Sequence, residues 1–356
     1  MDKTNGTFDA EAKAAQLVEE STSWDTSVVV PAAPEDIPTV DVGAYFRTGD
    51  LADLTQPAGT LRYALEEVGF HQLVGHGMEP QLMRDILDTT RRFHALPLSV
   101  KRSILIDQPD HPVGGVGYMP VGTRKLPTRD RGNPNEAFLI KRDRDIDFAD
   151  NRWLPEAELP GFRNTVERYA TAITDLARRL LPVYATALDL EADFFAEGFT
   201  HPFSRLRMTH YPSNPTADNG TATDSNGADS NPVGELGSFG IPPHVDTTFI
   251  TLLLPDSPGL TIYSRLRDQW ILAPVVPGAF IVNAGELLRQ WSNDRVLSTR
   301  HFANNTSDES RYAVPFFFNA TADYPMTCLP SCCGPDNPPR YPTFSYLESQ
   351  GVVQGE

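Results

Sequence analysis

The sequence predicts a mainly β fold with flanking helices, and two observations support this. After Ser204, short apolar runs rich in Ile, Val, Thr and Phe alternate with turns that contain Pro or Gly, which is typical of an antiparallel sandwich or barrel. Before Ser204, apolar residues recur at helical spacing. A chain of 356 residues with 40% hydrophobic residues can form one large β-rich domain with helical additions.

The first part of the chain divides into a leader and a helix-rich region. Residues 1–35 are polar and acidic, and we expect a disordered or loosely attached leader. Residues 36–200 form the helix-rich N-terminal part. Its predicted elements are strands at 37–42 and 70–74, helical stripes within 61–68 and 83–93, and a helix over 165–181 that Pro182 should kink or end.

The predicted β core covers residues 201–325, and residues 326–356 form a C-terminal tail. Within the core, residues 213–240 are poor in apolar residues and rich in Asn, Asp, Gly, Ser and Thr, so we expect a mobile loop there. The composition leaves open whether this loop is a lid or a tolerated insertion. The expected strands are 205–211, 249–254, 259–263, 279–283, 299–303 and 312–318.

Composition restricts the possible partners and compartment. The net charge of −17 argues against a nucleic-acid binder, which needs clustered Lys and Arg. No apolar run approaches the roughly 20 residues of a membrane span, and no apolar signal core precedes Ser27. Cys328, Cys332 and Cys333 fit reduced thiols better than disulfides or a zinc site, because no fourth ligand is evident. We expect a cytoplasmic protein, and a monomer because coiled-coil heptads are absent.

Two short segments together predict a metal site. Pro243-His244-Val245-Asp246 contains a His-x-Asp pair, whose members would share a face on a strand. Alone, the pair is weak evidence, since a surface turn usually explains it. His301 lies in another strand-like run. Two histidines and one carboxylate can form the facial triad of non-haem iron(II) oxygenases, which leaves positions open for a co-substrate and O2.

Arg311 follows His301 by ten positions, at the head of an apolar strand. A buried guanidinium is costly unless it is paired, and its fork fits a carboxylate bidentately. The distal carboxylate of 2-oxoglutarate is one suitable partner, and a structural Asp or Glu is the other. The residues alone do not decide between them.

In this order the motifs resemble those of the iron(II)/2-oxoglutarate-dependent oxygenases, and more closely their isopenicillin N synthase-like branch. The resemblance extends from Ile37 to about Tyr346. Besides the metal and arginine motifs, it rests on 68–70, 76–77, 93–97 with Lys101, 135–138, 210–212, 258–260, Trp270, 277–285 and 291–293.

The resemblance implies a double-stranded β-helix, or jelly-roll, core with flanking helices. It implies His244, Asp246 and His301 as iron ligands and Arg311 as the clamp for 2-oxoglutarate. Tyr211 matches a tyrosine that hydrogen-bonds the co-substrate in relatives, and a packed aromatic residue is the alternative.

One residue departs from the family pattern. Ala313 stands where a serine usually helps to hold the co-substrate. The missing hydrogen bond is worth about 0.5–1.5 kcal/mol. This leaves room for an iron oxidase that does not consume 2-oxoglutarate.

The implied reaction couples 2-oxoglutarate decarboxylation and O2 to hydroxylation, desaturation or ring formation on a small molecule, by family default a specialised metabolite. Ascorbate is a candidate reductant. Phe249 and the Phe316-Phe317-Phe318 run could line the substrate pocket, with Phe249 and Phe316 as the first candidates, although core packing also explains most of them. The alternative from another class is a jelly-roll sensor that keeps a metal without turnover.

Overall fold

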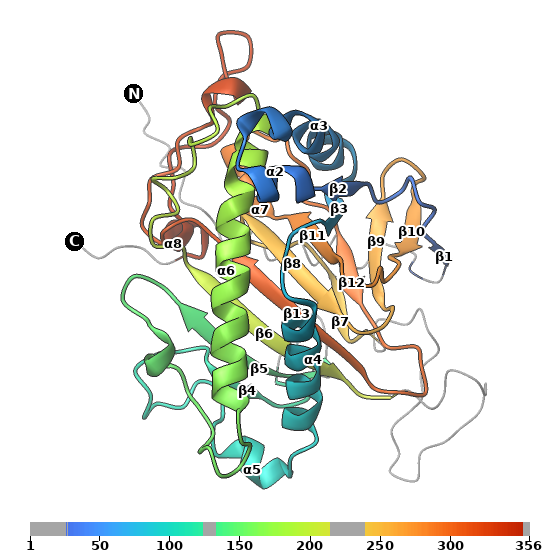
Figure 1. Ribbon diagram of the computed structural model, residues 1–356, viewed down its shortest axis with the longest axis vertical. Helices are drawn as coiled ribbons and strands as arrows, with labels where there is room; N and C mark the ends of the chain where they lie inside the picture. Colours follow the sequence, from blue (N-terminus) through green and yellow to red (C-terminus); the bar gives the residue numbers. More distant parts are fainter. Residues whose placement is uncertain (1–25, 27, 124–132, 214–238, 352–356) are drawn as a thin grey trace, which may run out of the picture.

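The computed structural model describes residues 26, 28–123, 133–213 and 239–351, which form two β sheets with helices on one side (Figure 1). One sheet has five strands, β1 (Val29–Pro31), β10 (Gln269–Leu272), β9 (Leu260–Ser264), β12 (His301–Ala303) and β7 (Ile241–His244). The other has eight, β2 (Thr39–Asp41), β3 (Phe70–Val74), β11 (Phe280–Ala284), β8 (Ile250–Pro255), β13 (Arg311–Phe318), β6 (Ser204–Tyr211), β5 (Glu136–Arg142) and β4 (Gly117–Met119).

This architecture confirms the predicted mainly β fold with flanking helices and a jelly-roll core. All six strands expected after Ser204 are present, with ends shifted by two residues at most. The sequence reasoning did not find β1, β4, β5, β7 or β10. Two of these are very short, and β7 contains Pro242 and Pro243, which argue against a strand when read alone.

Three long helical segments cover the outer face of the eight-stranded sheet, where α4 and α6 lie across its strands (Figure 1). They are α3 (Thr55–Tyr63) with its π-helical extension (Ala64–Val68), α4 (Pro80–His94) and α6 (Phe162–Ala187). The shorter helices are α2 (Gly43–Thr48), α5 (Leu98–Arg102), α7 (Glu286–Trp291) and α8 (Tyr346–Ser349), and 3-10 turns occupy 51–54, 148–150 and 330–332.

Successive side chains of β13 face opposite sides of the sheet, the hydrophobic core on one side and a cavity on the other. Val314, Phe316 and Phe318 are fully buried in the main hydrophobic cluster, which also holds the apolar stripe of α6. Their neighbours Pro315 and Phe317 face the other side of the sheet, where they line a cavity. Because successive strand residues point to opposite faces, one strand can pack the helices and shape a site at the same time.

Two expectations about the first half are corrected. Helix α6 continues five residues past Pro182 to Ala187, so Pro182 does not end the helix. The Pro182 carbonyl accepts from Thr186 Oγ1 at 2.9 Å, and Val183 and Tyr184 are fully buried, so tertiary packing maintains the helix. The loose leader cannot extend to residue 35, because Val29–Pro31 pair in parallel with β10. Residues 1–25 and 27 and most of the 213–240 loop lie outside the described residues.

Two further observations concern membrane-spanning helices and the three cysteines. Among the described residues, no helix is long and apolar enough to span a bilayer. Cys328, Cys332 and Cys333 are all free thiols, and no described group of possible metal ligands includes a cysteine.

Candidate active site

The structure brings the three predicted metal ligands together where β7 and β12 pair. His244 is the last residue of β7 and lies directly opposite His301, the first residue of β12. Asp246 follows two residues after His244, beyond the end of the strand. Its Oδ1 lies 3.6 Å from His244 Nε2 and 3.8 Å from His301 Nε2. Ligand atoms from all three side chains lie within 4.8 Å of one another, which is a suitable spacing for one shared cation.

Backbone carbonyls fix the orientation of both imidazoles. His244 Nδ1 lies 2.8 Å from Pro242 O, and His301 Nδ1 lies 3.0 Å from Thr299 O. A carbonyl can only accept, so each Nδ1 carries the proton. Each Nε2 is then left with its lone pair directed at the shared space, as in the outer-shell arrangement typical of metal-binding histidines.

Hydrogen bonds from two side chains fix the orientation of the Asp246 carboxylate. Its Oδ2 accepts from Thr251 Oγ1 of β8 at 2.7 Å and from Asn283 Nδ2 of β11 at 2.9 Å, which leaves Oδ1 for a ligand. Burial would raise the pKa of this carboxyl, but the two imidazoles and Asn283 outweigh it and hold the pKa below its usual range. Burial, followed by proximity to His244, lowers the pKa of His301 to about 4. The site therefore offers an ionised carboxylate and, at His301, a neutral imidazole at neutral pH.

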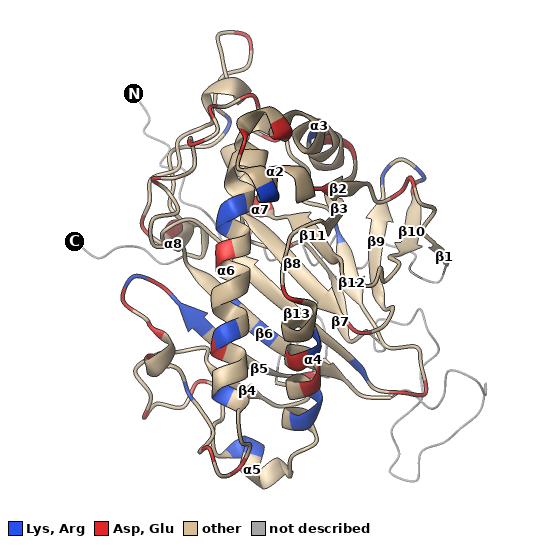
Figure 2. Ribbon diagram, viewed as in Figure 1, with Lys and Arg blue, Asp and Glu red and all other residues tan. Residues whose placement is uncertain are grey.

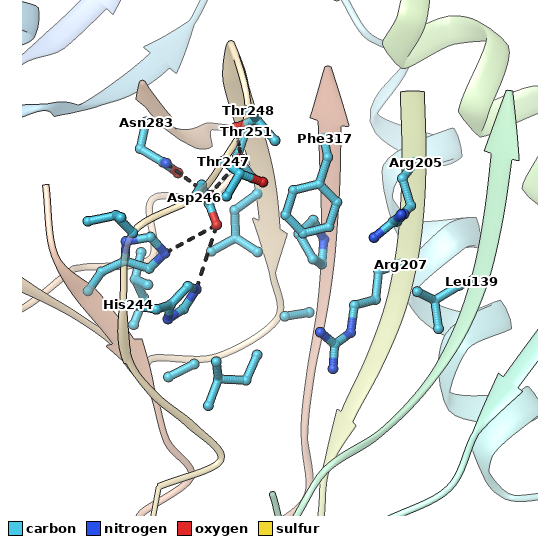
Figure 3. Close-up of a pocket in the computed structure, with 18 of the residues that line it drawn as sticks. Leu139, Arg205, Arg207, His244, Asp246, Thr247, Thr248, Thr251, Asn283 and Phe317 are labelled. Atoms are coloured by element: carbon cyan, nitrogen blue, oxygen red, sulfur yellow. Dashed lines mark hydrogen bonds and ion pairs between the residues drawn. The ribbon is translucent and has the colours of Figure 1, made fainter. Parts of the chain in front are cut away.

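The donor set fits a ferrous ion. Two imidazole nitrogens and one carboxylate oxygen on one side of a metal match the 2-His-1-carboxylate pattern of non-haem iron. The triad opens into a cavity of about 270 Å³, close to the size of small ligand pockets (Figure 3). Ligands could therefore approach the metal from this cavity.

Arg311 lines the same cavity and has the properties of an anion clamp. It is 1% exposed, and its Nε donates to Ser257 O at 3.2 Å. Its Nη1 has no hydrogen-bond partner among the described residues. The guanidinium lies 4.7 Å from the centre of the Tyr211 ring, and the two residues are paired between β13 and β6. Within the described ranges, no Asp or Glu forms an ion pair with Arg311, so the structural salt bridge is not observed.

Gly259 provides the space for Arg311. Its φ is +145°, and a Cβ there would lie 2.6 Å from Arg311 Nε and 2.3 Å from Asn304 O. Any larger residue would displace the guanidinium or the backbone. The glycine in the Pro258-Gly259-Leu260 motif thus has a steric cause.

A buried hydroxyl lies beside Ala313. Thr209 of β6 is directly opposite Ala313 of β13, and it is completely buried. Side chains of directly opposed residues lie on the same face of a sheet, about 4.5–5.5 Å apart at Cβ. In the described part of the chain, Thr209 Oγ1 has no hydrogen-bond partner. The sequence reasoning did not identify this residue.

The structure does not bring Phe249 and Phe316 to the cavity, which corrects their predicted role. Phe249 packs against Tyr184 and Phe199, and Phe316 belongs to the core on the helix side of β13. Phe317, the next residue, lines the cavity instead. Composition alone could not show which of the consecutive phenylalanines faces inward, because that depends on strand register.

Several cavity residues were missed because nothing in their local sequence signals a site. Arg205 and Arg207 do carry one signal, since charged residues two apart in a strand share a face. Tyr346 and Gln350 come from the C-terminal tail, far from the other lining residues in sequence. The residues that the sequence reasoning missed either line the cavity or donate hydrogen bonds to Asp246. They include Asn133, Arg205, Arg207, Thr251, Asn283, Tyr346 and Gln350.

Comparisons with known proteins agree with this geometry. The family model of the 2OG-Fe(II) oxygenase superfamily matches residues 202–320, and the model of the N-terminal region of non-haem dioxygenases in morphine synthesis matches residues 37–156. A 2-oxoglutarate-Fe(II) type oxidoreductase, hxnY, of Emericella nidulans is 31% identical, with 88% of each chain covered. The chain belongs to the 2-oxoglutarate/Fe(II) oxygenase superfamily.

Two further similarities are to a plant enzyme and to a solved structure. The kihadalactone A synthase LFS of Citrus sinensis is 33% identical, covering 83% of this chain and 87% of the relative. The structure of Neurospora crassa T7H in complex with alpha-KG superimposes with a TM-score of 0.74, at 23% identity, over 89% of this chain and 95% of that one. The latter similarity supports the fold. The protein is therefore a dioxygenase that uses Fe(II), 2-oxoglutarate and O2 to oxidise a small molecule.

Proposed function

We propose that His244, Asp246 and His301 bind the Fe(II), and that Arg311 and Tyr211 hold 2-oxoglutarate beside it. The main support is that three ligand atoms, within 4.8 Å of one another, face a cavity that also holds the buried Arg311 guanidinium. Arg311 binds the distal carboxylate because its Nη1 lacks a protein acceptor among the described residues. The Tyr211 ring lies against the guanidinium and restrains it.

We further propose that Thr209 replaces the serine usual in this family. Its buried hydroxyl lies next to Ala313 on the adjacent strand, and no described residue accepts or donates to it. A 2-oxoglutarate carboxylate at Arg311 would give this hydroxyl an acceptor. The substitution to Ala313 therefore does not favour an oxidase without 2-oxoglutarate, and the family membership does not favour it either.

When bound, Fe(II) supplies O2 activation, and each hydroxylation converts 2-oxoglutarate, O2 and a substrate C–H into succinate, CO2 and a C–OH. One oxygen atom enters succinate and the other enters the substrate. Desaturation or ring closure removes two hydrogens and releases the second oxygen as water. The protein holds the ligands in one protonation state, clamps the co-substrate and surrounds the reaction with apolar residues such as Leu253 and Leu260.

Anaerobic titration with Fe(II) and 2-oxoglutarate tests the assignment. The wild-type protein should develop a weak visible charge-transfer band at one iron per chain. Asp246→Ala should lose the band and the succinate formation, whereas the matched control Asp145→Ala, at an exposed carboxylate, should keep both. A full band in Asp246→Ala would refute the ligand set. Product formed without consumption of 2-oxoglutarate would instead favour the oxidase.

For the wider context, we propose a cytoplasmic monomer that does not bind nucleic acid, with a specialised metabolite as substrate. The net charge of −17 argues against nucleic-acid binding, and the three free cysteines fit a reducing compartment such as the cytoplasm. The relatives include the kihadalactone A synthase, which supports a specialised metabolite as the substrate. Light scattering of the purified chain and a metabolite screen monitored by succinate formation would test these proposals.

A further inference from the structure

A carboxylate lies next to the co-substrate clamp and has no role in the function proposed above. Strand β8 carries no charged residue and ends at Pro255, and Asp256 is the next residue (Figure 2). Pro255 pairs with Ala313, so Asp256 lies beside the start of β13, where Arg311 is located. The Asp256 side chain is only 9% exposed. A carboxylate so far removed from water is costly unless hydrogen bonds compensate for it.

Asp256 fixes the backbone at Arg311. Its Oδ1 accepts from the backbone N–H of Tyr312 at 2.9 Å, and its own N–H donates to the Tyr312 carbonyl at 3.0 Å. The Tyr312 N–H belongs to the peptide bond that follows Arg311. Because a peptide bond is planar, the carboxylate that holds this N–H also restricts the orientation of the Arg311 backbone.

The same carboxylate oxygen reaches the Arg311 side chain through Ser257. Ser257 Oγ donates to Asp256 Oδ1 at 2.9 Å, and the Ser257 carbonyl accepts from Arg311 Nε at 3.2 Å. Arg311 Nη1 has no hydrogen-bond partner among the described residues, so the Nε contact orients the guanidinium and leaves Nη1 for a ligand. Asp256 therefore restrains both the backbone and, through Ser257, the guanidinium of Arg311.

An arginine of α4 holds the other oxygen of Asp256. Arg91, in the last turn of α4, places Nη2 3.0 Å from Asp256 Oδ2, and its guanidinium lies 5.6 Å from the centre of the Tyr312 ring. The Arg91 side chain is 45% exposed, so this ion pair contributes little by itself. The two hydrogen bonds that Oδ1 accepts should therefore matter more to the clamp than the ion pair.

We propose that Asp256 is a positioning residue that orients Arg311 for the distal carboxylate of 2-oxoglutarate. This inference rests on the proposed function, because that function assigns the distal carboxylate to Arg311. A bidentate contact between arginine and a carboxylate depends on the orientation of the guanidinium plane, and a small misplacement of a binding group is costly. Asp256 is not among the described residues that line the cavity, so it acts through Arg311.

The test compares two 2-oxo acids that differ at one end. 2-Oxopentanoate has a chain of the same length as 2-oxoglutarate, with a methyl group in place of the distal carboxylate. Both are titrated anaerobically into the Fe(II)-loaded protein, and the charge-transfer band gives a Kd for each. The ratio of the two Kd values measures the contribution of the distal carboxylate separately from iron chelation. The wild-type protein should favour 2-oxoglutarate by about 100-fold, as expected for two charge-assisted hydrogen bonds.

Variants assign this preference to Asp256. Asp256→Ala releases the Tyr312 N–H and Ser257 and should lower the ratio by about tenfold, with the iron Kd unchanged. Asp256→Asn keeps an oxygen for both donors and should retain most of the ratio. Ser257→Ala removes one contact, should lower the ratio by about threefold, and decides the matter if Asp256→Ala does not fold. Asp323→Ala, which removes a carboxylate from an exposed ion pair with Arg144, is the control.

The ratio distinguishes a positioning role from general damage, because a disturbed fold would weaken the binding of both acids alike. A lower ratio in Asp256→Ala that Asp256→Asn largely restores supports the proposal. An unchanged ratio in both Asp256→Ala and Ser257→Ala overturns it.

Arg311→Gln separates the two levels of failure and should bring the ratio close to one. If it does so while Asp256→Ala and Ser257→Ala keep the wild-type ratio, the positioning role alone is wrong. If Arg311→Gln itself keeps the wild-type ratio, the clamp assignment and this inference are wrong together.

Discussion

Two clusters in the described part of this oxygenase place two histidines around one carboxylate, and they differ in what occupies the centre. In the candidate iron site, the free faces of His244, Asp246 and His301 meet at a cavity. In the second cluster, His94 and His210 flank Glu136, and Lys101 Nζ lies 2.9 and 3.2 Å from the two carboxylate oxygens. A protein cation thus already pairs with the carboxylate that a metal would need.

The residues of the second cluster make structural contacts with one another and with Tyr118. Tyr118 donates to Glu136, and His210 Nδ1 lies 2.8 Å from Glu136 Oε1. His94 and Lys101 lie at the end of α4 and in α5, whereas Glu136 and His210 are paired between β5 and β6. The cluster therefore fastens the helices to the sheet. The comparison shows that ligand type and spacing are insufficient, because a metal site also needs an unpaired carboxylate and an open side.

Matched histidine substitutions should separate the two clusters most strongly. His301→Ala removes a proposed ligand and should abolish stoichiometric iron binding and turnover. His94→Ala should leave one iron per chain, because His94 belongs to the second cluster and its Nε2 lies 3.0 Å from Met208 O, away from the proposed iron ligands. Iron content after anaerobic loading, with succinate formation, measures both. Loss of iron in His94→Ala without unfolding would contradict the structural role.

Glu136→Ala should mainly affect stability. It leaves Lys101 buried without its carboxylate, which typically costs about 3–5 kcal/mol in the free energy of unfolding. Glu158→Ala, at an exposed position, is the control and should change little. Urea denaturation of the metal-free protein measures the difference. A near-normal stability for Glu136→Ala would show that the cluster does not hold the fold together.

The same cluster predicts a pH dependence. Burial would raise the pKa of Glu136, but hydrogen bonds from His210, His94 and Lys101 lower it far below its usual value. A lowered folded-state pKa stabilises the protein above the unfolded-state value, about 4.3, and this contribution is lost as the pH falls below it. Glu136→Gln should therefore flatten the loss of stability below about pH 4.3. An acid unfolding curve as steep as that of the wild type would contradict this prediction.

Removing support from Asp246 should weaken iron binding without eliminating it. Asn283→Ala deletes the 2.9 Å hydrogen bond to Oδ2 and should raise the iron Kd by about 10–100-fold, the usual effect of an outer-shell partner. Asn337→Ala, an exposed asparagine near the C-terminus, is the control. Competition with a metal chelator measures the affinity. An unchanged Kd would mean that Thr251 alone orients the carboxylate.

The smallest effect concerns the co-substrate clamp. Thr209→Val removes the hydroxyl with little change of shape and should raise the KM for 2-oxoglutarate by about 2–10-fold. Ala313→Ser should lower that KM and reduce the effect of Thr209→Val, because the two hydroxyls would serve the same carboxylate. Initial rates at varied 2-oxoglutarate give both values. Additive effects in the double variant would contradict a shared role.

The sequence was most informative where local patterns suffice. The apolar runs predicted the strands of the core, and the His-x-Asp pair with His301 predicted the ligands that the structure brings together. The second cluster was not predicted, because its residues come from distant elements and only the β5–β6 register brings Glu136 beside His210. Strand parity likewise decided between Phe316 and Phe317, and packing around Val183 and Tyr184 outweighed the helix-breaking tendency of Pro182.

Anomalous diffraction at the iron edge, from crystals loaded anaerobically with Fe(II) and 2-oxoglutarate, tests the central claim most directly. The account predicts one peak per chain, bonded to His244 Nε2, Asp246 Oδ1 and His301 Nε2, with 2-oxoglutarate extending towards Arg311. A peak between His94, Glu136 and His210, or no peak at the His244 site, would contradict it.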